Sequence, residues 1–277
     1  MDSQKLAMLE HKAASVRKDV LNMVCNMGSG HLGGSFSIVE MLLALYDHAM
    51  KVDPANPAWE DRDRFILSKG HCAPALYAVL KDKGYFPAQW LLDSFRRIDS
   101  KLQGHPDMNK TPGVDMTTGS LGIGLSVGCG MAHAARLTQK DFHVYVLLGD
   151  GEVNEGQVWE AAKTAAHLKL ANLTALVDQN GYQNDGATGD EMSMEPLAQK
   201  WEAFGWRVFQ VDGHDIRAVA DALDEAKKGG PSVVLCKTQK GKGVSFMEDD
   251  PVLYHSKCPV GALYQQAVAE FAEEESV

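Results

Sequence analysis

The beginning of the chain shows the spacing of apolar residues that is typical of helices. Steps of three and four residues separate Leu6, Leu9, Ala13, Val16, Val20 and Val24. This spacing predicts an amphipathic helix that ends near Gly28. A glycine-rich segment, GSGHLGGS, follows, and Ser37-Ile38-Val39-Glu40 then has the pattern of a capping box. The box predicts a second helix that runs through Met50, so we expect the glycines to lie between two helices.

Further along, short apolar runs alternate with helical patterns. The runs predict strands at residues 65–67, 144–148, 173–177, 208–211 and 233–235. The patterns between them predict helices at 73–83, 122–137, 158–168, 196–204 and 216–228. Strands that are apolar on both faces and alternate with helices predict an α/β fold, a parallel sheet with helices on both faces. We expect a single domain over residues 1–277, with a short, frayed acidic tail, EEES, before Val277.

Composition narrows the class of protein. A chain of 277 residues with 45% hydrophobic and 23% charged residues is typical of a folded, soluble protein. The formal net charge of -10 opposes binding to nucleic acid or anionic lipid. No apolar run is long enough for a membrane span, and the start has no signal-peptide pattern. The five cysteines are scattered without a Cys-x-x-Cys pair, which predicts reduced thiols and a cytoplasmic protein.

The sharpest local signal is Gly149-Asp150-Gly151, directly after the strand HVYVLL. Asn180 follows the next strand thirty residues later, about the length of one βαβ crossover. Because the carboxyl ends of parallel strands gather at one edge of a sheet, we expect Asp150 and Asn180 to approach each other there. Their oxygens, with a backbone carbonyl from the turn at Gly181-Tyr182, suit Mg²⁺ and hence a phosphorylated ligand. We expect Gly151 to let the backbone approach the phosphate, and a helix that starts near Gln157 to direct its amides at it.

Histidines supply a second signal. Four of the ten follow a glycine in turn-like segments: His31, His71, His105 and His214. Such histidines can donate hydrogen bonds, move protons or hold sugar hydroxyls. The pattern Gly28-x-Gly30-x-x-Gly33 matches a dinucleotide-binding fingerprint in letters only, because a helix rather than a strand precedes it, and we reject nicotinamide binding.

Several motifs together resemble one family. GDGEVNEG, followed by DQNGYQNDG, is similar to the thiamine-diphosphate motif. Further segments occur in the order found in transketolases: GSGHLGGSFS, LSKGHCAPALY, LQGHPD, TTGSLGIGLS, KTQKGKGVSFME and YHSKCP. The resemblance extends from about Lys12 to Leu263. It implies the thiamine-diphosphate-binding fold and identifies the chain as similar to the N-terminal subunit of a split transketolase, which carries the diphosphate-binding domain alone.

The resemblance also implies roles for individual residues. Asp150, Asn180 and the Tyr182 carbonyl match the ligands of Mg²⁺, which Ca²⁺ or Mn²⁺ can replace. The matches to cofactor-binding positions are His71, Gly119, Ser120, Leu121, Gly151, Glu155, Asn180 and His255. Among these, Gly119, Ser120 and Leu121 match a turn against the cofactor rings, and Glu155 matches a glutamate that links two active sites. The histidines with implied catalytic roles at the substrate channel are His31, His71, His105 and His255.

Two positions depart from the family pattern, and one histidine has no counterpart in it. Ile123 stands where a glutamine is usual, which removes a polar group near the cofactor. Ser256 stands where glycine is common, so the loop that carries His255 could adopt another conformation. His214 receives no role, and Asp212, Lys240 and Lys242 are weaker loop candidates.

The implied reaction is transfer of a two-carbon glycolaldehyde unit from a ketose phosphate, or a related acidic ketose, to an aldose, a step of carbohydrate metabolism. Histidines with pKa values near neutrality would move the protons. The resemblance implies a separate C-terminal subunit with the pyrimidine-binding domain, an α2β2 heterotetramer and no activity of this chain alone. Three alternatives remain open from the sequence: the α subunit of a thiamine-dependent 2-oxoacid dehydrogenase, part of a deoxyxylulose-phosphate synthase, and a non-catalytic binding module.

Overall fold

The centre of the molecule is a parallel β-sheet of five strands. The computed structural model describes residues 1–274. Its strands are β1 (Arg64–Leu67), β2 (Val144–Gly149), β3 (Leu173–Gln179), β4 (Arg207–Asp212) and β5 (Ser232–Lys237). They are arranged in the order β1-β2-β3-β5-β4, with every neighbouring pair parallel. All five predicted strands are confirmed, and each extends slightly beyond its predicted bounds.

The pleat of the strands divides the hydrophobic core between two faces. In β2, Tyr145 and Leu147 pack into the core on one face, whereas Val144, Val146 and Leu148 pack into the core on the other. Successive side chains of a strand point to opposite faces, so a run that is apolar throughout requires cover on both sides. The predicted burial on two faces is therefore confirmed for this strand.

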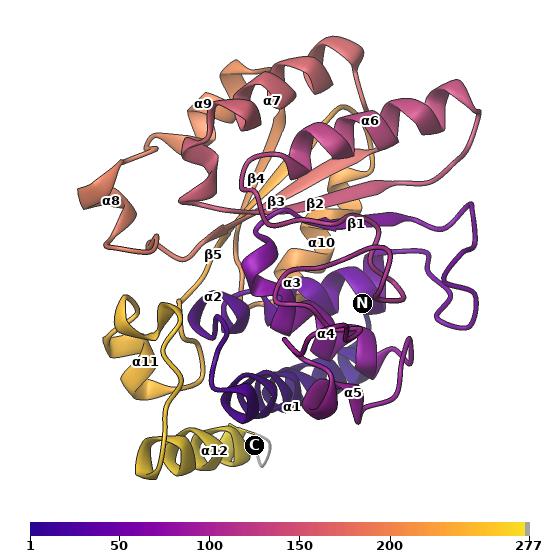
Figure 1. The fold of residues 1–277 in the computed structure, drawn as a ribbon. Helices are drawn as coiled ribbons and strands as arrows, with labels where there is room; N and C mark the ends of the chain where they lie inside the picture. The colour runs from indigo at the N-terminus through magenta and orange to yellow at the C-terminus, as the bar shows by residue number, and fades with distance from the viewer. Residues whose placement is uncertain (275–277) are drawn as a thin grey trace.

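Helices provide that cover in two layers (Figure 1). One layer contains α6 (Gly124–Leu137), α7 (Gly156–Leu168) and α9 (Leu197–Ala203). The other contains α1 (Ser3–Met27), α3 (Val39–Ala44), α4 (Ala73–Asp82) and α10 (Ile216–Ala226). The predicted α/β class with helices on both faces is confirmed. The first helix ends as expected, because Gly28 adopts a left-handed conformation that an L side chain disfavours.

The predicted second helix is present, but its predicted cap is wrong. Helix α3 continues directly into a π-helical turn, η1 (Leu45–Ala49), so the helical segment ends one residue before the predicted Met50. A short helix, α2 (Gly33–Phe36), precedes it. Gly33 and Gly34 lie inside α2 and not between helices. Ser37 is no cap, because its hydroxyl donates to Gly34 O and to Asp178 Oδ2. The Glu40 carboxylate accepts from Arg17 Nη2 at 2.5 Å, so long-range partners take both side chains of the expected capping box.

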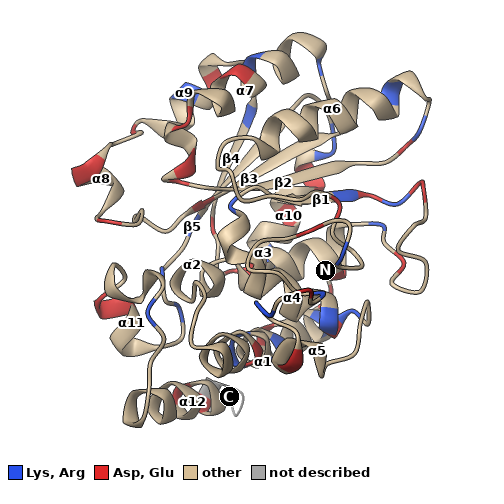
Figure 2. Cartoon of the chain, in the orientation of Figure 1, with Lys and Arg blue, Asp and Glu red and all other residues tan. Residues whose placement is uncertain are grey.

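The remaining elements connect and surround the layers. They are η2 (Gly70–Cys72), α5 (Trp90–Asp93), η3 (Glu152–Asn154), α8 (Thr188–Glu191), α11 (Ser245–Asp249), η4 (Leu253–His255) and α12 (Ala262–Glu274). Figure 2 shows acidic residues on the short helices α8 and α11. The start of the predicted acidic tail lies in α12, and residues 275–277 lie outside the described residues. Within residues 1–274, no helix combines the length and apolarity that crossing a membrane requires.

Candidate functional site

The carboxyl ends of β2 and β3 bring the two predicted oxygen donors together. Gly149 of β2 is in register with Asp178 of β3, so the residues that follow each strand lie at the same edge of the sheet. The Gly181 amide donates to Asp150 Oδ2 at 2.7 Å, and the Gly151 amide donates to Asp150 Oδ1 at 2.8 Å. The loop after β3 is thus tied to the turn after β2 through the Asp150 carboxylate.

Asp178 organises this edge, although the sequence did not single it out. Its carboxylate accepts from Lys69 Nζ at 2.6 Å and from the Ser37 hydroxyl at 2.7 Å. Asn180 Nδ2 donates to the same carboxylate at 2.7 Å, and the Thr238 hydroxyl donates as well. Because the amide nitrogen of Asn180 is held in this way, the orientation of its oxygen is fixed. That oxygen accepts from the Tyr182 amide at 3.1 Å.

A cavity of about 480 Å³ opens at this edge of the sheet. Ten of the predicted site residues line it: His31, His71, His105, Gly119, Leu121, Asp150, Gly151, Asn180, Tyr182 and His255. They come from seven separate segments of the chain. The parallel sheet therefore gathers the residues of the resemblance into one place.

Three of the histidines form a cluster in this cavity. The ring centroids of His31 and His71 lie 5.2 Å apart, those of His31 and His255 also 5.2 Å, and those of His71 and His255 5.5 Å. His105 lies against Gly119, where a Cβ atom would come within 3.4 Å of its ring. Nδ1 of His31 and Nδ1 of His255 are buried and have no hydrogen-bond partner in the described structure. Buried nitrogens without partners are costly, which fits a polar ligand in this cavity.

The expectation of pKa values near neutrality is wrong for the four histidines of the cavity. Burial lowers the pKa of His71 to about 4, and the charge of Lys69 adds to the effect. Burial and the neighbouring His71 lower the pKa of His31 to about 4. Burial and Lys240 lower the pKa of His255 to about 3, and the pKa of His105 is also lowered, chiefly by burial. All four imidazoles therefore stay neutral at pH 7, because burial and nearby positive charges disfavour the protonated form.

Burial also shifts the pKa values of two charged residues that line the cavity, Asp150 and Lys240. The pKa of Asp150 rises to about 7 because the carboxyl is buried and Asp178 lies close by. The pKa of Lys240 falls to about 8 through burial and the positive charge of Lys69. The Lys240 ammonium donates to Gln183 O at 2.8 Å. The site thus combines an acidic group that favours a cation with a buried lysine that favours an anion.

Glu152, another lining residue missed at the sequence level, fixes the glycine turn of the cavity. Its carboxylate accepts from the Gly122 amide at 2.8 Å and from the Gly149 amide at 3.0 Å. The Ser68 hydroxyl donates to it as well. Burial raises the pKa of Glu152, and these donors act against that rise. This carboxylate therefore holds the turn that contains Gly119 and Leu121 against the end of β2.

Two predicted cofactor residues lie outside the cavity wall. Ser120 lines a small neighbouring groove with Gly119 and Ile123 instead. Glu155 is exposed and lies over Gly122, where a Cβ atom would come within 2.6 Å of the Glu155 Cβ atom. The helix expected near Gln157 begins at Gly156 but contributes no lining residue, because the short turn η3 comes between it and the cavity. Gly151 and Glu152, which precede this helix, do line the cavity.

The two departures from the family pattern have different structural outcomes. Ile123 is 41% exposed, so the missing polar group leaves an apolar side chain at the surface beside the glycine turn. Ser256 has φ -134°, which any residue can adopt. Serine at that position therefore requires no strained backbone, and His255 reaches the cavity.

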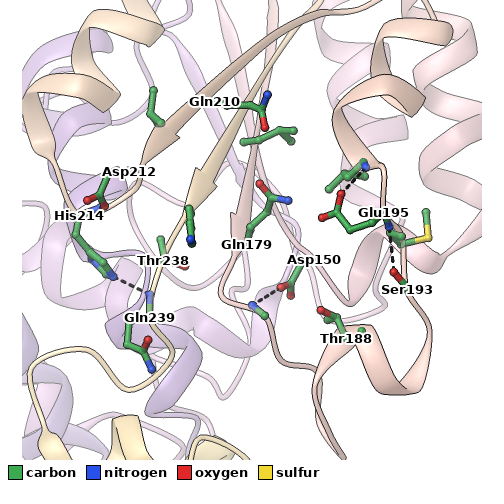
Figure 3. A pocket seen from close by; sticks show the side chains of 17 residues that line it. Asp150, Gln179, Thr188, Ser193, Glu195, Gln210, Asp212, His214, Thr238 and Gln239 are labelled. Carbon is green, nitrogen blue, oxygen red and sulfur yellow. Dashed lines mark hydrogen bonds between the residues drawn. The ribbon is translucent and has the colours of Figure 1, made fainter.

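His214 lies apart from the other glycine-histidine pairs, in a second cavity of about 820 Å³ (Figure 3). The cavity lies at the ends of β3, β4 and β5 and shares Asp150 with the first. Nδ1 of His214 lies 3.0 Å from Glu40 Oε2, and its Nε2 accepts from the Gln239 amide at 2.8 Å. His214 thus anchors the loop from which the next residue, Lys240, enters the first cavity. The second cavity contains none of the other three histidines, so the first is the candidate site.

No group of three or more His, Cys, Asp or Glu side chains among residues 1–274 is arranged to hold a metal ion. A cation at Asp150 would rely on amide and carbonyl oxygens and on oxygens of its ligand. Mg²⁺ is commonly held in this way, by one or two carboxylates together with phosphate oxygens and water. The donor set around Asp150 therefore fits a magnesium-bound phosphate.

Fold and site together define an α/β protein with a cavity at the carboxyl edge of a parallel sheet, and the residues that line this cavity suit a phosphorylated ligand. The family model described as transketolase, thiamine diphosphate binding domain, matches residues 9–256. The chain belongs to the transketolase family. This match confirms the predicted resemblance, the thiamine-diphosphate-binding fold and the class of ketol-transferring enzyme.

Individual relatives agree with the family. The chain is 46% identical over 274 residues to a 6-deoxy-6-sulfo-D-fructose transketolase subunit of a Clostridium species, a match that covers 98% of this chain and 99% of the relative. It is 43% identical to a subunit of the apulose-4-phosphate transketolase of Actinobacillus succinogenes, with 96% of each chain covered. The structure of this chain matches the crystal structure of transketolase from Campylobacter jejuni with a TM-score of 0.89, and the two sequences are 31% identical. That match covers all of this chain and 43% of the other, so the chain spans less than half of that transketolase.

Proposed function

We propose that this chain, with a partner subunit, transfers a two-carbon ketol unit from an acidic ketose to an aldose by means of thiamine diphosphate and Mg²⁺. The observation that carries the proposal is the convergence of four histidines, Asp150 and Asn180 on one cavity in a member of the transketolase family. The bound cofactor supplies the carbon centre that accepts and releases the two-carbon unit. The residues around the cavity are this chain's contribution to binding the cofactor and to moving protons.

The metal is held, in this proposal, by Asp150, the Asn180 side-chain oxygen and the Tyr182 carbonyl. Support comes from the raised pKa of Asp150, because a buried carboxyl group that carries no cation resists ionisation. Asp178 supports the site indirectly, since it fixes the Asn180 amide. A divalent cation would favour the ionised form of Asp150 and would compete with the amide of Tyr182 for the Asn180 oxygen.

The diphosphate lies, in this proposal, against Gly151, His71 and Lys240. A Cβ atom on Gly151 would come within 2.9 Å of the Gln183 Cβ atom. Glycine at this position therefore allows the loop that carries Gln183 to pack closely against the backbone of Gly151. The Lys240 ammonium is largely buried, and burial lowers its pKa to about 8. An anion beside it would stabilise its charged form and so gain affinity. The lysine was only a weak candidate from the sequence.

The histidines act on the sugar in this proposal. His31, His105 and His255 are neutral, so each ring has one nitrogen that donates a hydrogen bond and one that accepts a hydrogen bond. Neutral imidazoles can orient sugar hydroxyls and take up a proton from one of them. An anionic cofactor in the cavity would offset the lysine charges that depress the pKa values of His71 and His255. Ligand binding would therefore move these pKa values toward the pH at which proton transfer is efficient.

The substrate is, in this proposal, a ketose that carries a phosphate or sulfonate group. One relative is named for a sulfonated ketose and another for a sugar phosphate. The chain covers 99% and 96% of these two relatives, and both are named as subunits. We therefore infer a separate partner that supplies the pyrimidine-binding domain, in an assembly of two copies of each chain related by two-fold symmetry.

Reconstitution of the two subunits tests this function. Ketol transfer and pyruvate decarboxylation are measured with this chain, with the partner and with both, in the presence of thiamine diphosphate and Mg²⁺. We expect ketol transfer only with both chains. Turnover by this chain alone would refute the need for a partner, and pyruvate decarboxylation without ketol transfer would refute the reaction.

The variant Asp150→Asn tests the metal ligand in the same assay. We expect it to lower Mg²⁺-dependent ketol transfer by at least about 100-fold, because an amide ligand attracts the cation less than a carboxylate does. Asp190→Asn is the matched control, because Asp190 lies exposed on α8 and outside both cavities. Equal activity of the two variants would contradict the role of Asp150.

A further inference from the structure

Two thiols from opposite ends of the chain meet beside the candidate site. Cys25 lies in the last turn of α1, and Cys258 lies in the segment between η4 and α12. The thiol of Cys25 donates to Pro259 O at 3.8 Å, and the thiol of Cys258 donates to Val24 O at 3.7 Å. Each sulfur therefore contacts the residue adjacent to the other cysteine.

The environment distinguishes this pair from the remaining cysteines. Cys25 and Cys258 are partly exposed, whereas the other three are buried: Cys72, Cys129 and Cys236. The neighbouring Cys25 thiol lowers the pKa of Cys258, and the positive charge of Arg96 acts in the same direction, although burial opposes both. The neighbouring Cys258 raises the pKa of Cys25, with burial as the second cause. Cys258 is thus the thiol that more readily becomes a thiolate, and the thiolate is the reactive form.

We propose that Cys25 and Cys258 form a reversible disulfide when the protein meets a hydroperoxide. The Cys258 thiolate attacks a peroxide oxygen, the O–O bond breaks, and the released oxygen leaves as water with the thiol proton. The resulting sulfenic acid is attacked by the Cys25 sulfur, the S–O bond breaks, and the hydroxyl leaves as a second water with the Cys25 proton. Two thiols lose two electrons and two protons, and one hydrogen peroxide becomes two waters.

The position of the pair gives the disulfide a structural consequence. Cys25 and Pro259 are 234 positions apart in the sequence, so the bond would close almost the whole chain into one loop. Cys258 follows His255 by three residues, and His31 follows the end of α1. Because these two histidines are in ring contact, the bond would fix two of the segments that build the cavity. A neighbouring contact already joins α12 to α1, since the Tyr264 hydroxyl donates to Asn22 Oδ1 at 2.7 Å.

Peptide mapping of the full chain tests the proposal without reference to its activity. The reduced protein is treated with hydrogen peroxide, blocked with iodoacetamide after unfolding, and digested without reductant. We expect one cross-linked peptide that joins Cys25 and Cys258, while the three buried cysteines remain alkylated as internal controls. Dithiothreitol should remove the cross-link. Free thiols at both positions, a link to another cysteine, or irreversible oxidation of Cys258 with Cys25 unlinked would each overturn the proposal.

Physical measurements on the same oxidised sample provide a second test. A long loop closed by a disulfide restricts the unfolded chain, so we expect the melting temperature to rise by about 5 °C. Amide hydrogen exchange at residues 256–261 should become slower. An unchanged melting temperature together with unchanged exchange in a sample that carries the cross-link would refute the proposed fixing of the two segments.

Single substitutions distinguish the roles of the two thiols. In Cys25→Ser we expect a sulfenic acid at Cys258, trapped by dimedone, because no second thiol can attack it. In Cys258→Ser we expect Cys25 to stay unmodified under the same conditions. Circular dichroism verifies that each variant is folded. The reverse pattern, with modification at Cys25 alone, would contradict Cys258 as the attacking thiol.

Discussion

Asp178 fixes the side chains of Lys69 and Asn180 at the edge of the sheet. This carboxylate is fully buried and still has a lowered pKa, because Lys69 and two hydroxyl donors outweigh the effect of burial. It neutralises Lys69 and orients Asn180 through the same oxygen. The functional candidates Asp150 and Lys240 bind neutral backbone groups, and burial shifts the pKa values of both toward the neutral forms. Lys69 and Asp178, which hold the site together, are thus paired with each other, whereas the two residues proposed to bind a ligand are held by backbone groups.

The buried neutral imidazole of His71 predicts a loss of stability in mild acid. Its pKa is about 4 in the fold against an ordinary value of 6.5, so between these values only the unfolded chain binds the proton. Stability should therefore fall as the pH is lowered from 6.5 toward 4. We expect His71→Gln to reduce this fall by about 1–2 kcal/mol between about pH 7.5 and pH 5, measured by urea denaturation without cofactor.

His11→Gln is the control for this measurement, because His11 lies exposed on α1. It should keep the wild-type dependence of stability on pH. A fall in His71→Gln as steep as that of the wild type would show that His71 is not kept neutral by burial.

Sequence reasoning found the residues of the site that carry recognisable motifs and missed those that support them. Asp150, Asn180 and the glycine-linked histidines stand in short patterns with chemical meaning. Glu152 and Asp178 have no such pattern, because their roles arise from donors far away in the sequence, such as Ser68 and Lys69. The lowered histidine pKa values were also beyond reach, since burial is a property of the folded cavity.

Among the secondary-structure elements, the strands followed the sequence most closely. A run such as 144–148 is apolar at every position, and both faces of the sheet are covered. The cap of the second helix was predicted wrongly, because Ser37 and Glu40 form the local pattern of a cap but bind Asp178 and Arg17 in the fold. A local rule failed where buried polar residues found partners from other elements.

Helix α6 packs against β2 through a glycine, which gives a test at this scale. A Cβ atom on Gly128 would come within 2.6 Å of Val146 Cγ2, whereas one on Gly130 meets no atom within 4 Å. We expect Gly128→Ala to lower the free energy of unfolding by about 1–3 kcal/mol through overpacking. Gly130→Ala, in the same helix, should raise it by about 0.5–1 kcal/mol because alanine favours the helix. Chemical denaturation of both variants measures the difference, and equal effects would contradict the close contact of α6 with the sheet.

In the whole molecule, the order of strands determines where chemistry is possible. Parallel strands place all their carboxyl ends at one edge, and both cavities open there. The first cavity has the clustered histidines, the lysines Lys69 and Lys240 and the glycine turns, and the second shares only Asp150 with it. The family binds thiamine diphosphate, and the cavity and its charges favour the proposed position of the diphosphate at the ends of β2 and β3. The compartment, the number of domains and the assembly with a partner stay predictions.

A crystal structure of the chain with its partner, thiamine diphosphate and Mg²⁺ tests the central claim most directly. The account predicts a metal ion in contact with Asp150, Asn180 and the Tyr182 carbonyl, and the diphosphate beside Gly151 and Lys240. A cofactor bound in the 820 Å³ cavity, or a metal ion that contacts neither Asp150 nor Asn180, would contradict it.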